Sequence, residues 1–76
     1  NDLFLPNPAV NYISLNSTFE NEVISAEIFD LKGQIIRSVS DVKQVDISEL
    51  NEGLYIIFAR DANGSIYSTK LLKTSY

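Results

Sequence analysis

This sequence consists of short apolar segments that are separated by residues typical of turns. Gly33 and Gly64 each close a turn that an aspartate opens, Asp30 in the first and Asp61 in the second. Aspartate accepts hydrogen bonds from backbone amides ahead of it, and glycine adopts the positive φ that a hairpin needs. Because no segment keeps the longer period of an amphipathic helix, the pattern predicts an all-β fold, a small antiparallel β-sandwich. The six strands expected span residues 10–15, 23–29, 34–39, 44–47, 54–60 and 66–72.

Alternation along these strands assigns side chains to faces. Ile24, Ala26 and Ile28 share one parity in the second strand, so we expect them on one face. The fifth strand, residues 54–60, is the most apolar and is expected near the middle of a sheet. The connection before it is expected to hold at most a single helical turn that ends at Gly53.

Two prolines mark the start of the chain. Proline fixes φ and disfavours helix in the residue before it, so Pro6 and Pro8 predict an extended leading segment over residues 1–9. The β-sandwich is expected to follow over residues 10–73. With 76 residues there is room for one modest core, so residues 1–76 are expected to form a single domain.

The composition excludes several classes of partner. Six basic residues against ten acidic ones give a net charge of −4, which argues against nucleic acid and anionic membranes as ligands. No apolar run approaches the length of a membrane span, and no amino-terminal signal peptide is recognisable. Cysteine is absent, so no disulfide stabilises the core.

The sequence lacks several residue types and motifs that enzymes commonly use. Histidine is absent as well as cysteine, which removes the commonest general base and the commonest ligands of zinc. No glycine-rich phosphate loop occurs. We therefore expect no enzyme activity, no catalytic residue, no metal and no cofactor.

Three weaker signals have both a functional and a structural interpretation. The acidic residues Asp41, Asp46, Glu49 and Glu52 could bind calcium, but they lack the spacing of a calcium loop, so solvated loop charge is favoured. The triplet at residues 16–18, Asn-Ser-Thr, matches an N-glycosylation motif but is better explained as a turn.

Aromatic residues give the third signal. Four tyrosines and four phenylalanines could form a sugar-stacking platform on an exposed sheet face. Tyr55 and Phe58 lie in the most apolar strand, however, and tryptophan is absent. Packing in the core or at an edge is therefore favoured, and Tyr55 is expected in the core.

Four short motifs occur in a fixed order along the chain. They are Leu5-Pro6-Asn7-Pro8, the run 26–33 that ends in Asp30-Leu31-Lys32-Gly33, the run 45–57 that contains Gly53-Leu54-Tyr55, and Lys70-Leu71-Leu72-Lys73. Each motif alone is weak, but their order and separation together resemble the type A C-terminal sorting domain of the type IX (Por) secretion system of Bacteroidota. The resemblance covers nearly the whole chain. The extension Thr74-Ser75-Tyr76 after the last lysine is a small departure from the family pattern.

This resemblance implies a fold and a role. The fold is an immunoglobulin-like sandwich of six to seven strands, covalently continuous with an N-terminal cargo protein. The cargo enters the periplasm, and the domain then directs it across the outer membrane to the cell surface or the medium. The implied partners are the type IX secretion machinery and a surface sortase that removes the domain.

Recognition of such a signal must use its surface and exposed backbone. An edge strand offers unpaired amides and carbonyls, and the last strand is the candidate. Lys70 and Lys73 would supply specificity beside it, or would instead protect the edge from aggregation. Gly33, Gly53, Pro6 and Pro8 are expected to be structural. An uncovered edge could also permit a weak homodimer.

Two other functions compete with sorting. One is a carbohydrate-binding or adhesive β-sandwich appended to a secreted enzyme, and the other is a structural spacer. An exposed row of tyrosine and phenylalanine on one sheet face would favour the carbohydrate-binding alternative.

Overall fold

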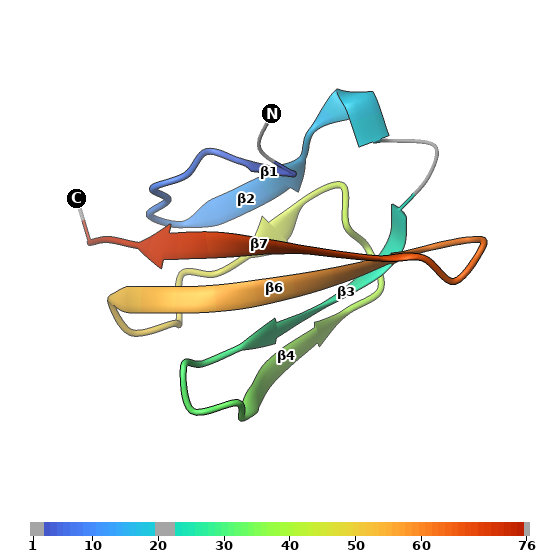
Figure 1. Ribbon diagram of the computed structural model, residues 1–76. Coiled ribbons are helices and arrows are strands. Elements are labelled where there is room, and N and C mark those ends of the chain that lie inside the picture. Colours follow the sequence, from blue (N-terminus) through green and yellow to red (C-terminus); the bar gives the residue numbers. More distant parts are fainter. Residues whose placement is uncertain (1–2, 20–22, 76) are drawn as a thin grey trace.

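The computed structural model describes residues 3–19 and 23–75, which fold into two antiparallel sheets (Figure 1). The three-stranded sheet has the order β1-β2-β5 and the four-stranded sheet the order β4-β3-β6-β7. The elements are β1 (Phe4–Leu5), β2 (Tyr12–Leu15), the 3-10 helix η1 (Ser17–Phe19), β3 (Val23–Phe29), β4 (Ile35–Val39), β5 (Val45–Asp46), β6 (Gly53–Asp61) and β7 (Ile66–Lys73). The prediction of a small all-β sandwich is confirmed.

Most predicted strands are present, with shifted ends. The bounds of β3 agree with the prediction, whereas β2 and β5 are shorter than expected. Phe4–Leu5 forms a strand that the sequence did not predict, because it pairs with β2 through the register Phe4↔Leu15. The expected helical turn before β6 is absent from the described residues, where the Leu50 amide donates to the Ile47 carbonyl in a simple turn (3.0 Å).

The expected face of Ile24 is wrong. Ala26 and Ile28 share one face, which is buried, but Ile24 is 54% exposed. The pairing of β3 with β6 shifts register between Val23 and Ser25. Such a bulge adds one residue to one strand and reverses the alternation beyond it, so Val23 enters the core in place of Ile24.

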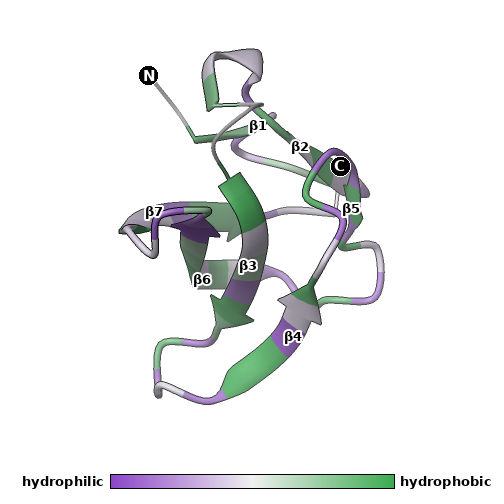
Figure 2. Ribbon diagram, turned by 90° about the vertical axis from the view of Figure 1, so that its right-hand side faces the viewer, coloured by the Kyte–Doolittle hydropathy of each residue, from purple (hydrophilic) through white to green (hydrophobic). Residues whose placement is uncertain are grey.

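The core lies between the two sheets, which Figure 2 shows as separate layers. Its largest fully buried side chains are isoleucine and leucine: Ile13, Ile28, Ile47, Ile57 and Leu71. Ile13 comes from the three-stranded sheet, and Ile28, Ile57 and Leu71 come from the four-stranded one. Burial of such side chains contributes about 1.5–3 kcal/mol each, so these facing residues hold the layers together.

Both predicted hairpin turns use aspartate and glycine as expected. The Asp30 Oδ1 atom accepts the amides of Lys32 and Gln34, at 2.9 Å each, and Gly33 has a φ of 87°. Asp61 repeats this arrangement in the β6–β7 turn, where Gly64 has a φ of 86°. A positive φ is costly for residues with a Cβ atom, so glycine is required at both turns.

Candidate recognition surface at the terminal strand

Strand β7 forms one edge of the four-stranded sheet. It pairs with β6 along its full length, from Gly53↔Lys73 to Arg60↔Ile66. The most apolar strand, β6, lies inside this sheet between β3 and β7, as predicted. The last strand is therefore an edge strand, and one side of its backbone faces away from β6.

The leading segment covers part of this edge. The Asn7 side chain donates from Nδ2 to the Lys70 carbonyl (2.7 Å) and accepts the Leu72 amide at Oδ1 (3.0 Å). Ala9 continues the contact, because its amide donates to the Leu72 carbonyl (2.9 Å) and its carbonyl accepts the Thr74 amide (2.8 Å). Figure 1 shows this loop between β1 and β2 beside the C-terminal end of β7. The two outermost motifs of the sequence thus form one physical unit.

Side chains of the terminal motif divide between the two faces of the sheet. Leu71 is buried in the core, and Lys73 is also buried at 6% exposure, with its Nζ atom donating to the Thr74 carbonyl (3.1 Å). Lys70 and Leu72 are exposed on the outer face. Since strand side chains alternate, only Lys70 of the two lysines can contact a partner of the folded domain. The expectation that Lys73 offers an exposed contact or protects an edge is wrong.

The middle motifs have structural positions. Gly53 begins β6 opposite Lys73, and Tyr55 lies opposite Leu71. Tyr55 is buried, as expected, and its hydroxyl donates to the Asn51 carbonyl (2.6 Å). Asp30 and Gly33 form the β3–β4 hairpin, at the far side of the sheet from β7. The fold therefore joins the first and third motifs to the fourth along β7, whereas the second motif pairs with the third on the other side of β6, through Ile28↔Ile57 and Phe29↔Ile56.

Ala9 contributes to the edge, although nothing in its local sequence indicates this. Ala9 forms a parallel bridge with Lys73, although 64 residues separate the two positions. Alanine carries no polar side chain that could have indicated this contact. The only nearby signal is Asn7, which lies between two prolines and belongs to the first motif.

The acidic residues of the β5 region stabilise local turns. Asp46 accepts the amide (2.8 Å) and hydroxyl (2.6 Å) of Ser48, and these hydrogen bonds lower the pKa of its carboxyl group. Asp41 accepts the Lys43 amide in the same manner (3.1 Å). Among the described residues no three acidic side chains converge. Each of these two carboxylates is thus engaged within its own turn.

The triplet Asn-Ser-Thr at residues 16–18 also forms a turn. The Asn16 Oδ1 atom accepts the Thr18 amide (3.0 Å), and the Asn16 carbonyl accepts the Phe19 amide (2.9 Å). This turn contains η1, which Asn16 directly precedes.

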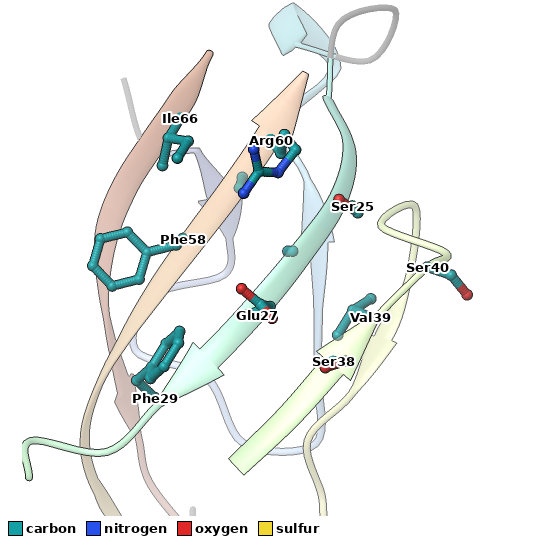
Figure 3. Close-up of a pocket in the computed structure, with 11 residues that line it drawn as sticks. Ser25, Glu27, Phe29, Ser38, Val39, Ser40, Phe58, Arg60 and Ile66 are labelled. Atoms are coloured by element: carbon teal, nitrogen blue, oxygen red, sulfur yellow. The ribbon is translucent and has the colours of Figure 1, made fainter. Parts of the chain in front are cut away.

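The outer face of the four-stranded sheet holds a shallow groove of about 550 Å³. Figure 3 shows Glu27, Phe29, Phe58, Arg60 and Ile66 along it, from β3, β6 and β7. The placement of Phe58 in the core or at an edge is wrong, since it is 40% exposed on a central strand. Its ring meets Phe29 edge to face, with centroids 5.4 Å apart and planes at 84°. Two rings at right angles do not form the aligned row that would favour carbohydrate binding.

These features describe a small β-sandwich that presents an edge strand and a partly apolar sheet face. A family model for secretion system C-terminal sorting domains matches residues 4–74. The chain belongs to this family, the C-terminal sorting domains of type IX secretion. No curated protein matches the chain.

Membership of the family fixes the general role. A domain of this kind is a sorting signal, not a catalytic unit, and it acts with the type IX secretion machinery on an N-terminal cargo. The destination is the cell surface or the extracellular space. In the part of the chain that the structure describes, no helix has the length and apolarity of a membrane span.

Proposed function

We propose that residues 1–76 form one folded sorting domain that carries a larger cargo through the outer membrane and is then removed by a surface sortase. The observation that carries the proposal is the family match over residues 4–74, together with the contact that joins its first and last motifs. The machinery recognises the folded surface at the end of β7. Lys70 is the charged contact there, because it is the exposed lysine of the terminal motif.

The structure favours a structural role for the other motif residues. Leu71, Lys73 and Tyr55 are buried, and they hold β7 against β6. Asn7 fixes the outer side of β7, and Gly33 and Gly53 set backbone turns. The uncovered part of the same edge would also let two copies pair weakly, which sedimentation at high protein concentration tests.

The experiment fuses residues 1–76 to a reporter that is exported to the periplasm of a Bacteroidota host. We expect the reporter at the surface or in the medium, and we expect deletion of residues 70–76 to leave it in the periplasm. This deletion also removes Leu71 from the core, so a second variant separates recognition from folding. Lys70→Glu reverses one exposed charge, should leave the unfolding midpoint unchanged, and should reduce export.

Two results would count against the proposal. The first is retention of the intact fusion in the periplasm while the domain is folded and the machinery exports its other substrates. The second is an exported reporter whose mass still includes the whole domain, which would refute removal by a sortase but not sorting.

A further inference from the structure

The outer edge of β7 is only half covered. Hydrogen bonds from Asn7 and Ala9 engage the Lys70 carbonyl, both backbone groups of Leu72 and the Thr74 amide. We propose that the remaining part of this edge, Ile66 to Lys70, is a docking site for an extended peptide strand of a protein partner. The proposal rests on the proposed sorting function, because the partner strand would belong to the secretion machinery.

Alternation identifies the backbone groups that are free. The groups of Lys70, Leu72 and Thr74 that Asn7 and Ala9 engage point away from β6, so even-numbered residues of β7 face outward. By the same alternation, the amide and carbonyl of Ser68 and the amide of Lys70 face outward. Within residues 3–19 and 23–75, no group forms a hydrogen bond with these three. Unpaired backbone groups in a row are a template for another strand.

The chain itself shows what kind of segment fits this edge. Ala9 bridges Lys73 in the parallel direction. The Asn7 side-chain amide supplies one donor and one acceptor, as a backbone peptide unit does, and so occupies the place of a strand residue. A partner strand that runs parallel to β7 would continue the line of residues 7–9 toward Ile66. Pairing as far as Leu72 would require Asn7 to leave, and full pairing as far as Thr74 would require Ala9 to leave as well.

Charge defines the partner further. The whole chain has a net charge of −4, yet the exposed charged side chains beside this edge are Lys70 and Arg60, which lies opposite Ile66. The exposed side chains of Ile66 and Phe58 add apolar surface between them. An extended segment with alternating acidic and apolar side chains would complement this edge.

Proline at position 68 tests the docking site in the export assay. Ser68→Pro removes an outward amide without removing an amide from the β6–β7 ladder, and proline is tolerated on edge strands when its nitrogen faces solvent. Without this amide, the partner strand loses one hydrogen bond from Ser68, which should weaken its binding by about tenfold. We expect export of the reporter fusion to fall by the same factor. The matched control Ser68→Ala keeps the amide and should be exported like the intact chain. Undiminished export of a folded Ser68→Pro fusion would overturn the proposal.

A measurement on the purified domain tests docking without export. The probe is a synthetic hexapeptide of alternating glutamate and valine, with alternating lysine and valine as the control, and the readout is amide hydrogen exchange. On Asn7→Ala, which frees the Leu72 amide, the acidic peptide should slow exchange at Ser68, Lys70 and Leu72 by about threefold at twice its Kd. The intact domain should show protection at Ser68 and Lys70 but not at Leu72, whose amide Asn7 already engages.

The two measurements separate the possible failures. If the intact fusion is not exported but the peptide protects Ser68, the sorting function fails and the docking site stands. If Ser68→Pro does not fold, the peptide measurement decides. Equal protection by both peptides refutes the acidic partner, and no protection by either refutes the docking site.

Discussion

Replacing Asn7 with alanine should destabilise the domain although the side chain lies on its surface. The substitution removes two hydrogen bonds, to the Lys70 carbonyl (2.7 Å) and from the Leu72 amide (3.0 Å). Each hydrogen bond contributes a net ~0.5–1.5 kcal/mol. After the substitution, water can reach the Lys70 carbonyl and the Leu72 amide. We therefore expect the free energy of unfolding to fall by about 1–2 kcal/mol, the lower part of the sum for two hydrogen bonds.

The assay is urea denaturation of the intact domain, supported by thermal melting. A loss of this size should lower Tm by roughly 4–16 °C in a chain of this length, with the urea m-value unchanged. The matched control is Asn11→Ala, which removes the same side chain from an exposed position. The control should stay within about 0.5 kcal/mol of the intact chain. If Asn7→Ala proves as stable as Asn11→Ala, the first and last motifs do not support each other in solution.

Three further predictions concern the core, a turn and pH. Leu71→Ala should cost about 2–5 kcal/mol in urea denaturation because Leu71 is fully buried, and a cost below 1 kcal/mol would contradict the described core. Gly33→Ala should cost about 1 kcal/mol through backbone strain alone, since φ is +87° and no described residue beyond the two chain neighbours has an atom within 4 Å of the added Cβ; an unchanged midpoint would contradict this turn. For Asp61, burial alone would raise the pKa of the carboxyl group. The hydrogen bonds from the Ser65 amide, the Tyr67 hydroxyl and the Asn63 amide together outweigh this effect, so the folded pKa lies below the ordinary 3.8. Its stabilising contribution should be complete above about pH 4 and decline as pH falls through the folded value, so Asp61→Asn should flatten the acid limb of stability against pH.

The turns and the order of the strands were accessible from sequence because their causes are local. Asp30 and Gly33 act within one hairpin, and the bounds of β3 follow from a run of apolar alternation. The strand at Phe4–Leu5 was missed, since two residues before a proline carry no periodic signal. Its existence depends on pairing with β2, which only the folded chain provides.

The errors have a common physical origin in tertiary pairing. Ile24 follows the period of its strand, but a register shift against β6 reverses its face. A lysine is ordinarily expected at the surface. Lys73, however, lies opposite Gly53 and beside Ala9, where its side chain is buried. Asn7 and Lys70 are recognisable from the sequence as members of two motifs. The hydrogen bond between them joins residues 63 positions apart, and no local pattern indicates it.

We predict that the folded shape of the domain, not its linear sequence, directs export. The most direct measurement is the fraction of a fused reporter outside the cell, compared between the intact domain and Ile57→Asp. The aspartate would place a charge in the fully buried site of Ile57 and unfold the sandwich. The substitution changes only the last residue of the third motif and no residue of the other three. We predict export of the intact fusion and retention of the variant in the periplasm. Equal export of both fusions would contradict the central claim.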